Sequence, residues 1–142
     1  MLGKLLISPT LLVKLFLLCI AVFSSHLTYS QKLEDYRWKQ RLVLLMHQGK
    51  ENAALQSQQE VLQTQTAALA EREMVVWMPT AAAQPAICRQ LRIPQDFEGL
   101  LLVGKDGGIK YQAPFVVPPQ KLFALVDAMP MRRAEIRRKK GQ

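Results

Sequence analysis

A predicted β-hairpin in the C-terminal third constrains the fold of this chain more than any other feature. Leu100–Val103 is an unbroken apolar run, as expected of a strand that is covered on both faces. Asp106-Gly107 follows it and is the strongest short-range signal for a tight hairpin turn. Ile109–Tyr111 then alternates apolar with polar residues. The sequence therefore predicts two antiparallel strands joined by this turn.

Two more apolar runs precede the hairpin, and helical patterns separate the three. Leu42–Met46 and Met74–Met78 are short continuous runs that are typical of buried strands. Asn52 is a favourable N-cap for a helix expected over residues 53–70, in which apolar pairs recur every seven residues. That spacing also fits a short coiled coil, but a helix docked on a sheet is the simpler interpretation.

Prolines mark the helices of the C-terminal half. A short helix is expected over Pro85–Leu91, because its first turn tolerates a proline. Pro118-Pro119 begins the last main helix, whose apolar residues recur at i, i+3, i+4 and i+7 from Leu122. Pro130 ends or kinks this helix, and the Arg/Lys stretch beyond it predicts a short, fraying helix.

The expected element order is therefore β-α-β-α-β-β-α. The first half requires parallel strands joined by right-handed crossovers, and the second half is an antiparallel hairpin followed by a helix. A mixed four-stranded sheet flanked by helices satisfies both requirements. We predict an α/β, thioredoxin-like domain over residues 31–131 and a basic C-terminal tail over residues 132–142.

The first thirty residues have the features of an export signal. Lys4 and Lys14 supply positive charge, Leu15–Phe23 is an unbroken apolar run, and a more polar stretch leads to a cleavage site expected after Ser30. The alternative is an uncleaved membrane anchor, although Lys14 interrupts the ~20 apolar residues that a spanning helix needs. We predict a signal peptide over residues 1–30 and a periplasmic or secreted mature protein.

Charge and cysteine content limit what the mature chain can do. The formal charge of +8 for the whole chain falls to +6 once Lys4 and Lys14 are removed with the signal. Cys88 is then the only thiol, so no internal disulfide forms, although export would permit one. The fold must therefore rely on its core for stability.

Three stretches of sequence give the chain a resemblance to a known family. They are Trp38–Arg41, Leu102–Lys110 and Phe123–Arg133, the last continued by Glu135, Arg137 and Arg138. Together they span most of residues 33–138, and in this combination the chain resembles domain-of-unknown-function family 4174. The resemblance implies a thioredoxin-like fold, small exported bacterial relatives, and related domains in animal extracellular proteins, including sushi-repeat and matrix-associated ones. It implies no established activity.

The place where a thioredoxin-type enzyme carries its redox cysteines has none here. Such a site needs a thiolate at the N-terminus of the first long helix and a second cysteine nearby to resolve the mixed disulfide. The corresponding residues 47–52 contain no cysteine. Dithiol and peroxidatic chemistry at this place is therefore excluded. Ser57, the only serine after residue 30, lies inside the predicted first helix, which argues against a Ser-His-Asp triad.

Two single residues remain as candidates for chemistry. Cys88 is either a reactive thiol that Arg89 and Arg92 favour, or a small buried hydrophobe, which is the usual role of a free cysteine. His47 follows the first strand at the sheet edge where α/β folds bind ligands, or is an exposed loop residue. A single histidine without a cluster of thiols or carboxylates does not make a metal site, so we predict no metal and no cofactor.

The basic tail is the feature best suited to a partner. It holds six cations within nine residues and one carboxylate, Glu135. The six are Arg132, Arg133, Arg137, Arg138, Lys139 and Lys140. Such a cluster binds an anionic surface, for example lipid head groups or acidic polysaccharide, or is a solvated helix end whose cations complement the helix dipole. Export disfavours nucleic acid as the partner.

These observations favour an exported, non-catalytic binding module over an enzyme. Its expected partner is an unidentified protein or a polyanion outside the cytoplasm, with contact to a membrane surface as one form of that binding. The alternative is a redox-accessory or thiol-reactive protein that uses Cys88.

Overall fold

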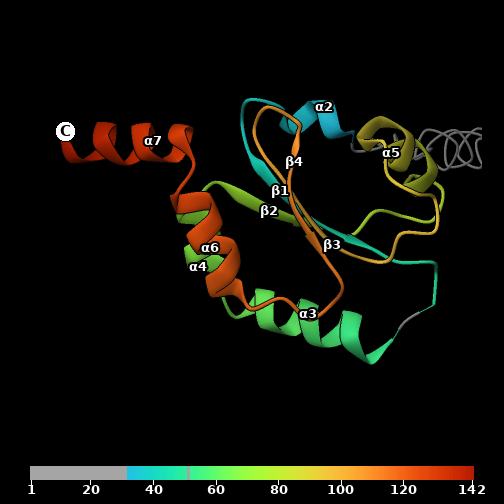
Figure 1. Cartoon of the computed structure of the whole chain (residues 1–142). Coiled ribbons are helices and arrows are strands. Elements are labelled where there is room, and N and C mark those ends of the chain that lie inside the picture. The colour runs from blue at the N-terminus through green and yellow to red at the C-terminus, as the bar shows by residue number, and fades with distance from the viewer. Residues whose placement is uncertain (1–31, 51) are drawn as a thin grey trace, which may run out of the picture. The chain divides into compact units, whose positions relative to one another are not determined.

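A mixed four-stranded sheet lies at the centre of the residues that the computed structural model describes, 32–50 and 52–142 (Figure 1). Its strands are β1 (Arg41–Met46), β2 (Met74–Trp77), β3 (Gly99–Val103) and β4 (Ile109–Ala113), in the order β2-β1-β3-β4. β1 pairs in parallel with β2 and antiparallel with β3, and β3 pairs antiparallel with β4. The predicted sheet, with its parallel first pair, is confirmed.

The two central strands are buried on both faces, which explains their continuous apolar sequences. In β1, Val43 and Leu45 join the core on one face of the sheet, whereas Leu42 and Leu44 join the core on the other. The leucines of β3 divide in the same way. All these side chains are at most 2% exposed, so β1 and β3 carry most of the apolar burial.

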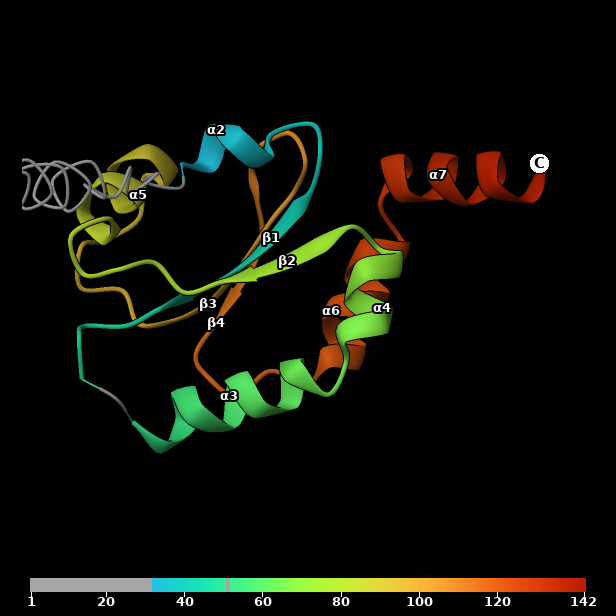
Figure 2. The same cartoon turned by 180° about the vertical axis from the view of Figure 1, so that it is seen from behind.

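Helices cover both faces of the sheet (Figures 1 and 2). α2 (Leu33–Tyr36) and α5 (Gln84–Leu91) lie on one face, where Leu33 and Ile87 are buried. α3 (Ala53–Gln63), α4 (Thr66–Glu71) and α6 (Pro119–Asp127) lie on the other. In α6, Leu122 and Val126 are fully buried, as the apolar periodicity predicted.

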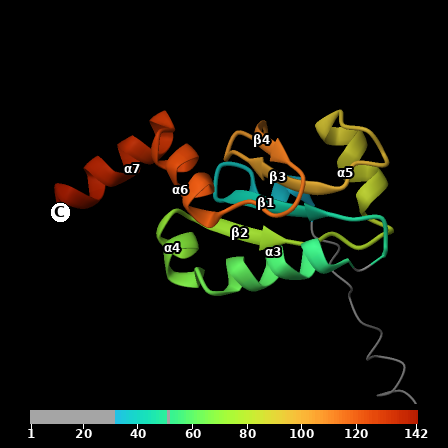
Figure 3. The same ribbon diagram turned by 60° about the horizontal axis from the view of Figure 1, so that its bottom comes forward.

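The last helix, α7 (Pro130–Lys140), follows α6 after two residues and leads away from the sheet (Figure 3). Pro130 begins α7, since a proline fits the first turn of a helix, and α6 ends three residues earlier at Asp127. The two helices contact each other near this junction. The predicted short basic helix is thus a helix of 11 residues.

Two expected elements differ from the structure. The helix expected over residues 53–70 is interrupted between Gln63 and Thr66, where the Thr64 hydroxyl donates a hydrogen bond of 2.7 Å to the carbonyl of Val61. This local bond competes with the regular helical pattern. The run around β2 is not a buried strand but the edge of the sheet, and Val76 is 36% exposed there.

The segment that leads into β1 packs on the sheet through two of its side chains. Leu33 is buried, and Tyr36 contacts Trp77 with 5.9 Å between the centroids of their tilted rings. Trp38 is 61% exposed. The predicted signal peptide, residues 1–30, lies outside the described residues. No helix within the described part of the chain is long and apolar enough to span a membrane.

Candidate functional site

Helix α7 divides its charged residues between the protein interior and the solvent. Arg132 and Glu135 lie on its inner face, and their side chains are only 2% and 10% exposed. They are three residues apart, which places them on the same side of a helix. The remaining charged residues of α7 are exposed. The helix is therefore anchored at its beginning and free along its C-terminal half.

Glu135 is the acceptor at the centre of the buried contacts. Its Oε1 accepts hydrogen bonds from Arg41 Nη2 at 3.1 Å and from Lys105 Nζ at 2.7 Å. Its Oε2 accepts from Arg41 Nη1 at 3.2 Å. Burial alone would raise the pKa of Glu135, but the hydrogen bonds from Lys105 and Arg41 outweigh it and hold the pKa below its ordinary value. Glu135 thus stays ionised and ties α7 to the start of β1 and to the hairpin.

Arg132 makes a second set of contacts at the same junction. Its Nη2 lies 2.8 Å from Glu71 Oε1, its Nη1 donates to the Glu71 carbonyl at 3.0 Å, and its Nε lies 3.3 Å from Asp127 Oδ1. Asp127 also pairs with Arg72 at 2.8 Å. Burial raises the pKa of Asp127, but hydrogen bonds from Arg72 and Arg132 bring it below its ordinary value. Arg132 is thus a structural residue whose donors are used inside the protein, and its prediction as an anion-binding residue is corrected.

The other five cations of the tail are exposed. They are Arg133, Arg137, Arg138, Lys139 and Lys140. Within residues 32–50 and 52–142, none of the five forms an ion pair with a carboxylate. The one carboxylate of the helix, Glu135, is directed inward, so it does not offset their charge on the outer face. The structure therefore presents an uncompensated cationic helix end to the solvent.

A cavity of about 470 Å³ lies where this helix end meets the segment that leads into β1. The lining combines an exposed tryptophan with cations and two carboxylates. It comprises Trp38, Lys39, Glu73, Lys105, Glu135, Arg138, Lys139 and Gln142. Lys105 forms ion pairs with both Glu73 and Glu135 in this cavity. The cavity is thus polar and continuous with the cationic surface of α7.

Trp38 is held firmly although its ring is exposed. Its backbone N–H donates a hydrogen bond of 2.6 Å to the carbonyl of Lys105. Its φ is +64°, in the left-handed region that bulky side chains rarely adopt. The guanidinium of Arg37 lies 5.7 Å from the centroid of the ring. The ring is therefore presented at the mouth of the cavity by a fixed backbone.

His47 lies in a different place and has local contacts. It is half-buried, its Nδ1 accepts a hydrogen bond of 3.2 Å from the N–H of Gly49, and its carbonyl accepts one from Gln84. A cavity of about 130 Å³ adjoins it. At the start of α3, where a redox cysteine would be expected, Asn52 caps the helix by accepting a 2.7 Å hydrogen bond from the N–H of Leu55.

Cys88 is a buried residue of α5. It is 1% exposed and lies in the same core as Leu44 and Leu101. Burial raises the pKa of its thiol, which disfavours the thiolate that nucleophilic chemistry needs. Arg89 and Arg92 are exposed, whereas the side chain of Cys88 is buried.

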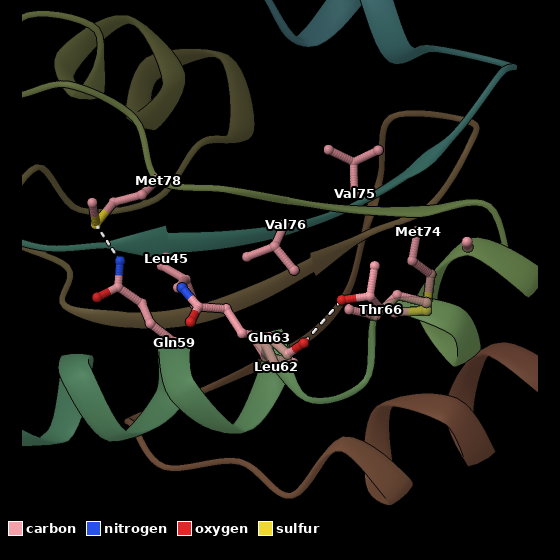
Figure 4. A pocket seen from close by; sticks show the side chains of 11 residues that line it. Leu45, Gln59, Leu62, Gln63, Thr66, Met74, Val75, Val76 and Met78 are labelled. Atoms are coloured by element: carbon pink, nitrogen blue, oxygen red, sulfur yellow. Dashed lines mark hydrogen bonds between the residues drawn. The ribbon is translucent and has the colours of Figure 1, made fainter.

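An apolar pocket of about 480 Å³ lies between α3, α4 and the edge strand β2 (Figure 4). Leu62, Met74 and Val76 contribute apolar surface. Gln59 and Met78 meet across its mouth, with 3.4 Å between Gln59 Nε2 and Met78 Sδ. Charged side chains do not line this pocket, and none of the predicted site residues does. No group of three or more His, Cys, Asp or Glu residues in the described part of the chain is placed to hold a metal ion.

Comparison with known sequences places the chain in a family. The profile described as "Domain of unknown function (DUF4174)" matches residues 32–135. The chain belongs to this family. The match covers the whole sheet and ends at Glu135, the residue that anchors α7. Among curated proteins, none matches the sequence.

Comparison with solved structures gives the fold. The reduced 2-Cys peroxiredoxin of Plasmodium vivax is similar, with a TM-score of 0.52 and 10% sequence identity over 72% of each chain. Together with the mixed sheet and its flanking helices, this likeness establishes an α/β, thioredoxin-like fold. At 10% identity, the likeness concerns the fold alone.

Sequence reasoning found the cations of the tail but missed the residues around them. Arg41 and Lys105 belong to a strand and a turn that lie far from α7 in the sequence, so their pairing with Glu135 has no local signal. The single glutamate among six cations was the available hint, since it marks the inner face of the helix. Trp38 was identified as a family feature but not as an exposed one.

Proposed function

We propose that this protein is an exported, non-catalytic binding module of thioredoxin-like fold that contacts anionic surfaces through its C-terminal helix. The contact residues are Arg133, Arg137, Arg138, Lys139 and Lys140. The observation that carries the proposal is that the charged residues of α7 lie on two different sides. The only carboxylate of this helix, Glu135, points into the interior and accepts hydrogen bonds from Arg41 and Lys105. The exposed half of the helix therefore carries positive charge alone.

Electrostatics supports a binding role for these residues. Four of them, Arg137 to Lys140, lie in the last turn of α7, where the helix dipole favours cations by a few tenths of a kcal/mol each. Their mutual repulsion opposes this gain, since like charges on neighbouring positions of a helix destabilise it. A partner that carries negative charge relieves the repulsion. The interaction should weaken with salt, because exposed charges are screened beyond about 10 Å at 0.1 M ionic strength.

The N-terminal sequence supports a partner outside the cytoplasm. Lys4, Lys14 and the apolar run Leu15–Phe23 support export, with cleavage after Ser30. The anionic surfaces outside the cytoplasm include lipid head groups and acidic polysaccharides. N-terminal sequencing of the exported product tests this part of the proposal. It should begin near Gln31, whereas a product that retains Met1 would indicate an anchor.

Charge neutralisation of the helix end tests the binding role. We define the tail variant as the replacement of Arg137, Arg138, Lys139 and Lys140 by Gln. A matched control replaces four exposed cations elsewhere, Lys32, Lys50, Arg89 and Arg92, by Gln. Both variants lose the same net charge, so a difference between them reports the position of the charge.

The tail variant should elute from an anionic matrix at lower salt than wild type, and the control variant should elute close to wild type. The melting temperature of the tail variant should stay nearly unchanged, because surface substitutions of this kind alter stability little. If the two variants elute together, net charge alone explains retention, and the helix end has no specific role.

A further inference from the structure

We propose that the cavity between Trp38 and α7 binds a uronic acid residue of an acidic polysaccharide. The inference deepens the proposed function and rests on it, since it names the ligand class of the same cationic surface. The structure assigns three kinds of group to this one cavity: an exposed aromatic ring, cations and carboxylates. An acidic sugar has a matching group for each of them.

The cations of the cavity match the carboxylate of the sugar. Lys39, Arg138 and Lys139 line the cavity, and all three are exposed. None of them forms an ion pair with a carboxylate in the described part of the chain, so their donors are open to a ligand. Arg138 presents the planar fork of donors that fits a carboxylate in two parallel hydrogen bonds.

The carboxylates of the cavity match the hydroxyl groups of the sugar. Glu73 pairs with Lys105 through Oε2 and has a side chain that is 45% exposed. A carboxylate has about four lone-pair sites, so Glu73 retains capacity to accept hydrogen bonds from ligand hydroxyls. Glu135 lies deeper and is already bonded to Arg41 and Lys105. Glu73 is therefore the acceptor that a sugar would meet first.

Trp38 matches the apolar face of the sugar ring. A tryptophan offers a large flat surface at a low cost in side-chain entropy, and tryptophan is enriched at binding surfaces. Its backbone lies in the left-handed region, which is unfavourable for a bulky side chain. Strained backbone of this kind concentrates at functional sites. The bond from its N–H to Lys105 fixes the ring beside the same lysine that reaches Glu73 and Glu135.

Because the cavity is lined by carboxylates as well as cations, it favours a uronate over other anions. A phosphate or a phospholipid head group brings concentrated negative charge and few hydroxyl donors, so Glu73 would oppose it. A membrane is flat, and a field of cations on α7 suffices to contact it without a cavity. The carboxylate and hydroxyl groups of a uronate use the whole lining.

Fluorescence provides a direct test, because the chain has only two tryptophans, Trp38 and Trp77. In a Trp77→Phe variant of the purified protein, Trp38 is the sole indole reporter. Titration with a galacturonic acid trimer should change its emission in a saturable manner. Maltotriose, which lacks the carboxylates, serves as the neutral control and should cause little change at the same concentrations.

Variants of Trp38 then assign the contact. Trp38→Ala should weaken binding of the trimer, measured by calorimetry, about tenfold or more, whereas Trp38→Tyr should retain most of the affinity. Glu73→Gln should also weaken binding of the trimer, whereas it should raise retention on anionic vesicles slightly, because it removes a negative charge beside the cationic helix end. Because Trp38 is largely exposed, its replacement should leave the melting temperature near that of wild type.

The outcomes separate this inference from the function on which it rests. Unchanged emission of Trp38 on saturation, or equal affinity of wild type and Trp38→Ala for the trimer, overturns the sugar site. If the tail variant still loses retention on anionic matrices in that case, the general binding role stands. If phosphatidylserine vesicles compete with the trimer and bind more tightly, the surface is a membrane contact and the sugar assignment is wrong. Absence of binding to every anionic probe overturns both proposals.

Discussion

Replacement of Glu135 by Gln should destabilise the fold severely, although Glu135 lies in a stretch that looks like a solvated basic tail. The change preserves the shape of the side chain and removes its charge. Arg41, which is 1% exposed, would then lose the one carboxylate with which it pairs in the described part of the chain. Lys105, which is 8% exposed, would keep only its pair with Glu73. Removing one partner of a buried ion pair costs about 3–5 kcal/mol, because the remaining charge stays buried without compensation.

The expected shift is large enough to measure by thermal unfolding. A change of 1 kcal/mol moves the melting temperature of a domain of this size by roughly 4 °C, so the variant should melt roughly 12–20 °C below wild type. Circular dichroism or differential scanning calorimetry at neutral pH reports this shift. A double-mutant cycle with Arg41→Met should recover part of the loss, since the uncompensated charge is then removed.

Glu60→Gln is the matched control, because Glu60 lies on the exposed face of α3 and undergoes the same chemical change. It should alter the melting temperature by no more than about 2 °C. The reasoning is refuted if Glu135→Gln melts within about 4 °C of wild type, or if Glu60→Gln is equally harmful. Either result would mean that α7 is not anchored by the contacts of Glu135.

Three further predictions concern the thiol, pH and export. The thiol of Cys88 should react slowly with iodoacetamide in the folded protein, because it is buried. Cys88→Ser should be less stable than Cys88→Ala by about 1–3 kcal/mol in urea unfolding, since serine buries a hydroxyl in an apolar core. Folding lowers the pKa values of Glu135 and Asp127. Their ionised forms therefore contribute fully to stability above the pKa values of the unfolded chain, near pH 4, and this contribution is lost as the pH falls through the lower pKa values of the folded protein. The melting temperature of wild type should therefore decrease when the pH is lowered below about 4, and the melting temperature of Glu135→Gln should decrease less steeply. In cells, replacing Leu18 by Arg within the apolar run should retain the protein in the cytoplasm, as fractionation would show; unaltered export would contradict the signal.

The sheet could be predicted from the sequence because its signals are local. The continuous leucines of β1 and β3 reflect burial on two faces, and Asp106-Gly107 produces the expected turn, with Gly107 at φ +85°. The Asp106 carboxylate accepts from the N–H of Gly108 at 3.1 Å and pairs with Lys110 at 2.6 Å, and the bond to Lys110 is the main reason that its pKa is lowered. Each of these features depends on residues within a few positions of one another.

The edge position of β2 could not be predicted in the same way. Its apolar sequence resembles that of β1, yet Val76 and Met78 are 36% and 43% exposed. The difference arises from the strand order, which places β1 between two neighbours and β2 beside one. Composition alone does not encode that order. The interruption at Thr64 was likewise hidden, because a threonine fits both a helix interior and a local hydrogen bond.

The candidate site was predicted only in its cations. The cluster of arginines and lysines indicated an anion-binding helix end, but the pattern did not separate Arg132 from the rest. Arg132 is buried where Glu71, at the end of α4, and Asp127, at the end of α6, accept its hydrogen bonds. The pairing of Arg41 with Glu135 joins residues 94 positions apart. Contacts at such a separation are set by the tertiary fold, so sequence patterns do not reveal them.

The central claim is that α7 is divided into an anchoring first half and a binding second half, and one comparison on an anionic column tests it. The elution salt of the tail variant and of the single variant Arg132→Gln is measured at low temperature, where both are folded. Their melting temperatures are measured separately by thermal unfolding. The account predicts that the tail variant elutes at lower salt with a melting temperature near that of wild type, whereas Arg132→Gln elutes almost as wild type and melts well below it. Loss of retention in Arg132→Gln together with full retention in the tail variant would contradict the division.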